Sequence, residues 1–414
     1  MFKNYLLTAY KVFLRRKLFT AINLLCIVLT LTVLMVLTAL LEHTFYPSGV
    51  EGKSDRFLQI VMMRSESPSG DSDRRSPLGY KLIEQYLKPM QSVEMVAAAT
   101  SPRAVSVYQE GRISELQMRR VDANYWKILD FTLLAGRLPT VEDEERGRMV
   151  AVINKTTAGQ LFGAEAAVGK TMHIGGQQLQ VIGVVDDEMH LNAFSDVWAP
   201  VTTFPSTEYK HQMHGEFTAL LLAKNPAGLA QIRSDVQQIA KGVEFSDPKE
   251  WSKAYFFADS KLDTAARLLM NGDGKTENSG AGLFLAIIVT LMLLFMTLPA
   301  MNLVNLNTGR ILERSSEIGV RKAFGATSAQ MAMQLIVENV LLCLAGGLLG
   351  LLLSQLALLW LENSGLIPYL KVSVNYAVML YGLLLTLVFG LLSGVLPAWK
   401  MSRLDPVHAL KGAI

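Results

Sequence analysis

The sequence predicts an α-helical membrane protein with four transmembrane helices and a large mixed α+β extracytoplasmic domain between the first two helices. Charged residues make up only 18% of the 414 residues, and the mean hydropathy is +0.29. Four stretches contain no charged residue at all, namely 18–41, 281–304, 339–361 and 376–399. The rest of the chain is about one quarter charged, which is the composition of ordinary water-exposed protein. A cytosolic enzyme, a disordered chain and a collagen-like fibre are therefore excluded.

Each uncharged stretch is long enough to cross a membrane. At about 1.5 Å per residue, 24 helical residues extend roughly 36 Å, which exceeds the ~30 Å of a hydrocarbon core. The first stretch is also longer than the apolar core of a signal peptide, about 7 to 15 residues, so we expect a retained helix. Before it, residues 1–17 have apolar side chains at helical spacing, which predicts a cytoplasmic interfacial helix.

The basic residues predict the orientation. They cluster in 1–17, in the loop 305–338 and in the tail 400–414, whereas the loop 362–375 contains only Lys371. By the positive-inside rule both termini and the loop 305–338 are cytoplasmic, and the domain 42–280 is outside. The net charge of +3 is thus a signal of orientation, and no nucleic-acid partner is expected.

The outer domain has patterns of both strands and helices. Strands are expected at 56–64 and 178–185, and helices at 77–87, 156–162 and 231–240. We expect two lobes, with an inserted lobe at about 106–204. The polar segments 65–76 and 271–280 are expected to be mobile loops. Both cysteines, Cys26 and Cys343, lie in the predicted spans, so the outer domain is expected to have no disulfide.

Motifs of catalysis are missing from the sequence. The triplets at 169–171 and 274–276 (GKT) lack the first glycine of a phosphate-binding loop, because residues 164 and 269 are alanine and leucine. We expect no catalytic group and no metal. A divalent-metal site remains the open alternative at two clusters of potential ligands: Asp186, Asp187, Glu188 and His190, and the pair His211 and His214.

The cytoplasmic loop has the most specific pattern. Residues 313–327 read ERSSEIGVRKAFGAT, with Glu313, Glu317 and Arg321 four residues apart, as in a short helix that ends near Gly325. Thr327 and Gln330 have the spacing of a capping box that begins the next helix. Such a short charged helix between two spans can transmit a push, although an ordinary interfacial loop would give the same pattern.

Three segments resemble a known family. The motif E-x-G-x-R-K-A-x-G-A in 317–326, LPAWK at 396–400 and LDPVHAL at 404–410 resemble the permease family of MacB, LolC/LolE and FtsX. In the outer domain, VDANYW at 121–126, LAGR at 134–137, AVIN at 151–154 and VGK at 168–170 resemble the MacB-type periplasmic core domain.

This resemblance implies a non-catalytic subunit of an ABC transporter in the bacterial inner membrane, working as a dimer. No fused ATPase domain is expected, so ATP and Mg²⁺ would be bound by two copies of a separate cytoplasmic ATPase. The second permease would be another copy or a paralogue, and membrane lipids and a periplasmic adaptor or hydrolase would be further partners. By resemblance, the ATPase docks on the loop helix, whose expected contact residues are Glu313, Glu317, Ile318, Gly319, Arg321, Lys322, Phe324 and Gly325.

Small residues in the third and fourth spans predict close helix packing. Gly346 and Gly350, and likewise Gly390 and Gly394, are four residues apart, and we expect the two spans to pack on each other. Glu338, at the cytoplasmic start of span three, is a candidate carboxylate for coupling to the basic loop, with simple solvation as the alternative.

Two functions follow from the resemblance. The first is export or extrusion of a substrate, driven by the partner ATPase through movement of the outer domain. The alternative is an FtsX-like regulator that transmits the same movement to an extracytoplasmic cell-wall hydrolase without transport. The two-lobed outer domain favours the first.

Overall fold

The computed structural model describes residues 9–371 except 12, 16, 110, 271–273, 314–319, 321–323 and 326, together with 380–382, 384, 387–388, 390–391 and 395. The chain divides into two compact units. One contains residues 1–41, 285–367 and 372–414, and the other contains Glu42–Phe284 with Pro368–Lys371. We call them the membrane unit and the outer unit.

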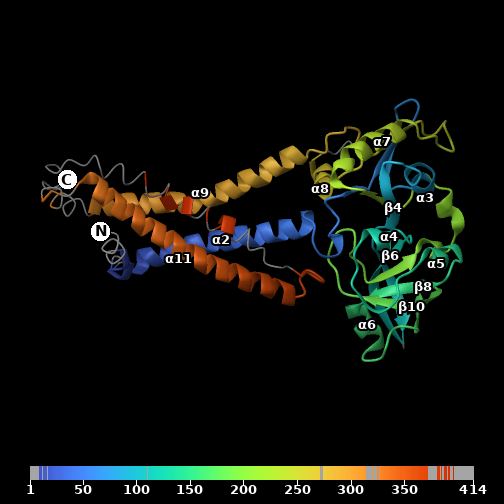
Figure 1. Cartoon of the computed structure of the whole chain (residues 1–414), viewed down its shortest axis with the longest axis horizontal. Coiled ribbons are helices and arrows are strands. Elements are labelled where there is room, and N and C mark those ends of the chain that lie inside the picture. The colour runs from blue at the N-terminus through green and yellow to red at the C-terminus, as the bar shows by residue number, and fades with distance from the viewer. Residues whose placement is uncertain are drawn as a thin grey trace. The chain divides into compact units, whose positions relative to one another are not determined.

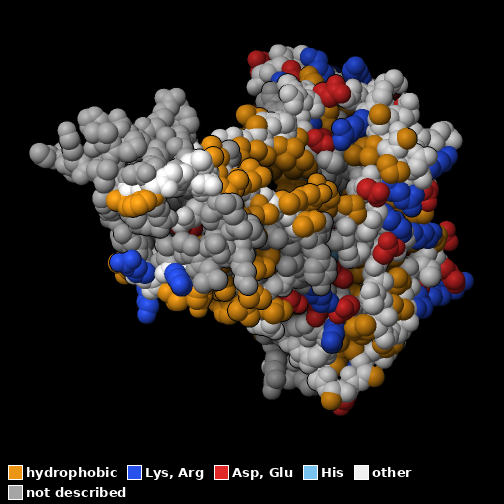
Figure 2. Space-filling view, turned by 60° about the vertical axis from the view of Figure 1, so that its left-hand side comes forward, with side chains coloured by type: hydrophobic (Ala, Val, Ile, Leu, Met, Phe, Trp, Pro, Cys, Tyr) orange, Lys and Arg blue, Asp and Glu red, His pale blue; other side chains and the backbone are white. Residues whose placement is uncertain are grey.

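The membrane unit is built from long apolar helices, α2 (Lys17–Phe45), α9 (Ala281–Glu313) and α11 (Ser328–Asn363) (Figure 1). Among the described residues three segments are long and apolar enough to cross a membrane: Thr20–Phe45, Ala281–Leu298 and Ala332–Asn363. The predicted fourth span, 376–399, lies mostly outside the described residues, so the count of four stays a prediction. In Figure 2 a broad orange area without charge contrasts with the mixed red and blue surface elsewhere.

The outer unit is organised around a ten-stranded mixed sheet. Its strands run in the order β1-β12-β4-β6-β11-β8-β10-β9-β5, and β7 pairs with β10. The sheet strands are β1 (Phe57–Ile60), β4 (Val93–Thr100), β5 (Arg103–Gln109), β6 (Arg112–Val121), β7 (Leu133–Gly136), β8 (Val150–Asn154), β9 (Thr171–Ile174), β10 (Gln177–Val185), β11 (Val197–Pro200) and β12 (Phe217–Ala223). A second sheet has the order β13-β2-β3, formed by Lys253–Tyr255, Met63–Glu66 and Asp73–Ser76.

Helices pack on both faces of this sheet. They are α3 (Tyr80–Leu82), its π-helical continuation η2 (Ile83–Leu87), α4 (Tyr125–Ile128), α5 (Val141–Glu145), α6 (Lys155–Phe162), α7 (Leu229–Lys241) and α8 (Lys261–Met270). In β8 alternate residues face different helices, because Val150 and Val152 pack in one core with α4, whereas Ala151 and Ile153 pack in another with α6. Short 3-10 turns lie at Gly49–Glu51, Val201–Thr203, Thr207–Lys210 and Pro226–Gly228.

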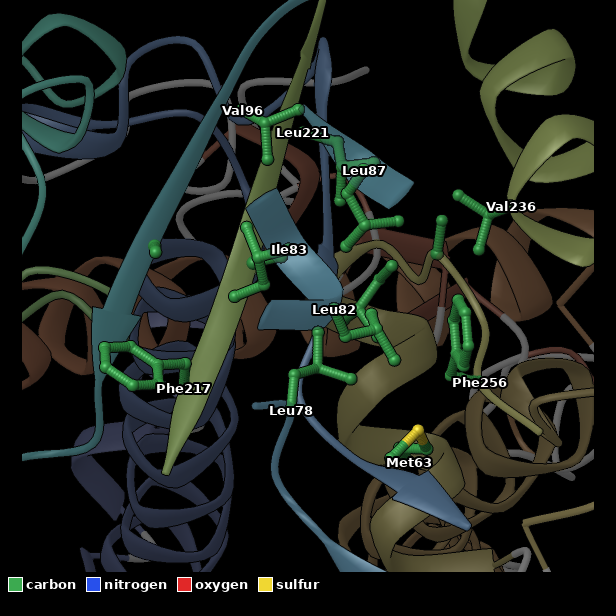
Figure 3. Packing of buried hydrophobic residues seen from close by; sticks show 14 of the residues in the cluster. Met63, Leu78, Leu82, Ile83, Leu87, Val96, Phe217, Leu221, Val236 and Phe256 are labelled. Atoms are coloured by element: carbon green, nitrogen blue, oxygen red, sulfur yellow. The ribbon is translucent and has the colours of Figure 1, made fainter. Parts of the chain in front are cut away.

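Three separate hydrophobic cores lie against the sheet. Leu82, Ile83 and Leu87 pack with Phe217 and Val236 in one of them (Figure 3). A second core holds Trp126 and Trp198, and a third lies under α6. The second core contains residues from both expected lobes, such as Ala97, Trp198 and Leu222, so the division into two lobes stays a prediction. In the sheet, a single Cα pair, Ala99 with Val121, joins β4 to β6.

The expectation of mobile loops was wrong for 65–76. Residues Met63–Glu66 pair with Asp73–Ser76 as an antiparallel hairpin, which β13 extends. Alternate side chains of β2 are buried, and that alternation is the signal of a strand with one face on a core. Residues 274–280 are also held, because Arg267 donates to the carbonyls of Thr276 and Glu277 at 2.7 and 3.1 Å.

Candidate coupling site

The segment expected to dock on the ATPase is described only in part. Of its expected contact residues, Glu317, Ile318, Gly319, Arg321 and Lys322 lie outside the described residues. Glu313 is the last residue of α9, and Phe324 is 89% exposed. Gly325 has φ of +90°, a left-handed conformation suited to glycine. The docking contact itself stays a prediction.

The predicted start of α11 is confirmed in detail. Thr327 Oγ1 accepts from the backbone N–H of Gln330 at 3.3 Å, and the Gln330 side chain accepts from Thr327 N at 3.1 Å. This reciprocal capping box satisfies two backbone donors that a helix start leaves unpaired. The helix α11 thus has a well-defined, capped start at Ser328.

Two glycines of α11 pack closely against another helix. A Cβ atom on Gly346 would lie 2.6 Å from Ile27 Cγ2, and one on Gly350 would lie 3.1 Å from Leu31 Cβ. Both contacts are with α2, where Thr32 Oγ1 also donates to the Gly350 carbonyl at 3.3 Å. Among the described residues these two glycines therefore contact α2, and the expected packing of span three on span four stays a prediction, because most of span four lies outside the described residues.

The other predicted residues of the membrane unit have local contacts. Gly390 lies against Cys343 of α11, whereas Gly394 is outside the described residues. Glu338 is buried and accepts from Gln334 Nε2, one turn earlier in α11, at 3.1 Å. The described residues thus do not test its expected coupling to the basic loop.

In the outer unit, one connection contacts the segment after α2 and the segment 368–371 directly, and it is linked to α8 through Glu51. We call residues 186–196, between β10 and β11, the junction loop. At its centre His190 is buried, with Nε2 3.0 Å from Ser48 Oγ and Nδ1 3.1 Å from Glu188 Oε2. Its ring also lies 4.6 Å from that of His43, near the end of α2. The junction loop is thereby bound to the segment that follows α2.

A buried ion pair extends this contact to α8. Glu51 Oε1 accepts from the backbone N–H of Asn192 in the junction loop at 2.8 Å, and Oε2 lies 2.8 Å from Lys261 Nζ. Both side chains are almost fully buried, and Lys261 also donates to the Tyr46 carbonyl at 3.2 Å. A buried pair resists separation, because a charge left alone in the interior is costly. Lys261 begins α8, the last helix before α9.

The segment 368–371 makes the third contact. Tyr369 Oη donates to Asp196 Oδ1 at 2.6 Å, and Lys371 Nζ lies 2.7 Å from Asp186 Oδ2. The Tyr369 ring also lies 6.1 Å from that of Phe194. These two residues come from the short loop between the predicted spans three and four, so both ends of the junction loop are bound to it.

The candidate metal ligands have other roles in the structure. Asp187 accepts from the N–H and hydroxyl of Thr156, and Asp186 and His190 have the partners given above. The Nε2 atom of His214 lies 2.7 Å from Ser65 Oγ, and burial lowers the pKa of His214 to about 4. In the described part of the chain, no three His, Cys, Asp or Glu residues are placed to hold a metal ion.

A polar cleft of about 750 Å³ lies between α3–η2 and α5. Tyr80 Oη donates across it to Glu144 Oε1 at 3.3 Å. At its floor the buried Asp122 carboxylate lies 3.1 Å from Lys88 Nζ, and burial raises the pKa of Asp122 to about 6. The two GKT triplets do not line this cleft. Their lysines form ion pairs elsewhere, Lys170 with Glu165 and Lys275 with Glu66.

Comparison with known proteins establishes the family. A model of the MacB-like periplasmic core domain matches residues 20–239, and a model of the FtsX-like permease C-terminal domain matches residues 286–406. The chain belongs to the FtsX-like permeases with a MacB-like periplasmic core domain. It is thus a membrane permease of the ABC transporter type with a periplasmic domain.

Among these permeases, the chain is similar to YknZ of Bacillus subtilis, described as an uncharacterized ABC transporter permease. The two are 25% identical over 78% of this chain and 77% of YknZ. It is also 27% identical to the macrolide export ATP-binding/permease protein MacB of Escherichia coli, over 70% of this chain and 42% of MacB. The chain therefore spans less than half the length of that relative.

Solved periplasmic domains of such permeases also match. The periplasmic region of MacB from Actinobacillus actinomycetemcomitans covers 54% of this chain, with 97% of its own length, 15% identity and a TM-score of 0.36. The extracellular domain of YknZ covers 54% of this chain and 97% of its own length, with 16% identity and a TM-score of 0.33.

The contacts of the junction loop with distant segments of the chain were not predicted from the sequence. Asp186 and His190 are candidate metal ligands in the sequence, yet their partners Lys371 and Ser48 are distant from them along the chain. The one available signal was Lys371, the single basic residue of its loop. An isolated lysine outside the membrane next to a span is consistent with a carboxylate partner, but it does not identify that partner.

Proposed function

We propose that this permease converts ATP hydrolysis by a separate cytoplasmic ABC ATPase into movement of its periplasmic domain, and that this movement exports or extrudes a substrate. The chain itself is proposed to be non-catalytic, with ATP and Mg²⁺ bound by the partner. Two ATPase copies would act on a dimer of permeases. The proposed location is the bacterial inner membrane, with both termini in the cytoplasm.

One observation carries this proposal: the junction loop binds the segment after α2 and the segment 368–371 directly, and it is linked through Glu51 to α8, which precedes α9. His190 contacts Ser48 after α2, Glu51 connects the loop to Lys261 of α8, and Asp186 and Asp196 bind Lys371 and Tyr369. Displacement of any of these segments would pull on the same loop. The loop joins β10 to β11 in the ten-stranded sheet, so the displacement would reach the sheet directly.

Export is favoured over the regulatory alternative by the relatives, since one is named a macrolide exporter and another an ABC transporter permease. The cleft beside Asp122 adds a polar surface in the outer unit where a transported molecule or a periplasmic adaptor could bind. The chemical class of the substrate is not part of the proposal.

The test of the ATPase contact is a charge reversal in the docking segment. The permease would be copurified with its ATPase and reconstituted in liposomes. Glu317→Arg is expected to reduce both copurification and permease-stimulated ATP hydrolysis, because it reverses the charge of a residue in the helix proposed to contact the ATPase. Glu362→Arg, at the exposed end of α11, is the matched control and should change neither. Unchanged stimulation in Glu317→Arg would refute the docking assignment.

Transport and regulation would be separated in cells that lack the protein. Export predicts accumulation or sensitivity to a compound that the intact cell extrudes, with normal cell-wall turnover. Loss of cell-wall hydrolysis with unchanged efflux would refute transport.

A further inference from the structure

The last turn of α8 has an apolar surface that the outer unit leaves uncovered. Leu268, Leu269 and Met270 are consecutive, and they are 63%, 67% and 39% exposed. Earlier in the same helix, Thr264 and Ala266 are buried against the domain. The helix therefore begins as a packed element and ends as an exposed apolar tip.

The contacts of α8 hold this tip beside the start of a membrane helix. Arg267 donates to the carbonyls of Thr276 and Glu277, and Ser279 Oγ donates to Asp263 Oδ1 at 2.7 Å. These bonds fold residues 274–280 back onto α8, so that a Cβ atom on Gly280 would lie 3.2 Å from Met270 Cβ. Gly280 is the residue immediately before α9, whose first 18 residues are apolar enough to lie in a membrane.

The geometry of the tip indicates what covers it. Consecutive helical residues are about 100° apart around the axis, so Leu268, Leu269 and Met270 point over more than half of the circumference. A protein partner docks on one face of a helix, whereas a fluid apolar phase surrounds an end that enters it. All three side chains are exposed, which fits the second arrangement.

We propose that Leu268, Leu269 and Met270 insert into the lipid interface on the outer side of the membrane, next to the point where α9 begins. They would anchor α8 to the bilayer surface, and through Lys261 they would also anchor the buried pair with Glu51. The partner of this surface is lipid, and the inference does not depend on the proposed export function.

The experiment is site-directed fluorescence on the full chain in liposomes. Cys26 and Cys343 are replaced by alanine, and Leu269→Cys or Leu268→Cys is labelled with an environment-sensitive fluorophore. The matched control is Leu134→Cys in β7, which is 49% exposed. The expected result at 268 and 269 is blue-shifted emission, strong quenching by lipids that are spin-labelled near the headgroup, and several-fold weaker quenching by aqueous iodide than at 134.

Two results would overturn the proposal. Iodide quenching at 269 equal to that at 134, without quenching by spin-labelled lipid, would place the tip in water. Protection from both quenchers would mean that a protein surface, such as a second copy of the chain, covers it. Each labelled variant must match the elution volume and thermal midpoint of the unlabelled protein, so that a misfolded variant is recognised. If one variant misfolds, the second labelled position still tests the proposal.

Discussion

Tyr369 Oη donates a 2.6 Å hydrogen bond to Oδ1 of Asp196, a residue distant in sequence at the end of the junction loop. Asp196 Oδ2 accepts from the backbone N–H of Gln117 at 2.7 Å, so the same carboxylate binds β6 and the segment 368–371. Asp196 is buried, and a hydrogen bond to a charged group contributes about 1.5 to 3 kcal/mol to stability.

Removal of the Tyr369 hydroxyl should weaken transmission more than stability. Tyr369→Phe keeps the ring beside Phe194 but loses the bond to Asp196. If the proposed function is correct, liposomes with the partner ATPase should show near-normal ATP hydrolysis and reduced movement of substrate. Tyr108→Phe, on an exposed strand residue, is the control. An equal loss of both activities would instead indicate general damage.

A larger residue at position 346 should separate α2 from α11. The Cβ atom of any substitution would meet Ile27 Cγ2 at 2.6 Å, and the further atoms of Gly346→Val would require the helices to move apart. Overpacking of this kind costs about 1 to 3 kcal/mol. The thermal midpoint of the detergent-purified chain should fall, and Gly282→Val, where nothing lies within 4 Å, should leave it nearly unchanged.

Asp122 should make the outer unit less stable as pH rises from about 4 to 6. Burial raises its pKa to about 6, so the folded state holds the proton more tightly than the unfolded state and is favoured in acid. The effect is at most about 3 kcal/mol, from a shift of roughly two units. Urea unfolding followed by the fluorescence of buried Trp126 and Trp198 measures it. Asp122→Asn should flatten this part of the profile, and exposed Asp71→Asn should not.

Asp143 should have the opposite pH dependence. Hydrogen bonds from Arg137, together with Arg148 and Thr140, hold the pKa of this buried carboxyl well below its usual range. Its stabilisation is therefore present above about pH 4 and is lost as pH falls. Asp143→Asn should lower the free energy of unfolding at pH 7 by about 1 to 3 kcal/mol. A variant as stable as the parent at pH 7 would contradict this assignment.

Features set by neighbouring residues could be predicted from the sequence, and features set by distant partners could not. The capping box at Thr327 depends on a residue three positions away, Gln330, and it is present. The helix that covers Gly346 depends on which of several apolar helices lies nearest, and a glycine spacing does not encode that choice. The hairpin at 63–76 was not predicted, because this segment contains more turn-forming residues than residues with the alternating pattern of a strand. The Tyr369 contact had no local signal.

The single pair between Ala99 and Val121 has a mechanical consequence. The other strand pairs of the sheet have from two registered positions, as between β11 and β8, to seven, as between β12 and β4. Because only one registered pair joins β4 to β6, the two parts of the sheet on either side of this strand pair are expected to rotate relative to each other more easily here than elsewhere. Under the proposed function, displacement of the junction loop is expected to rotate β11 and β10 relative to β4 about this strand pair, and to change the width of the polar cleft beside Asp122.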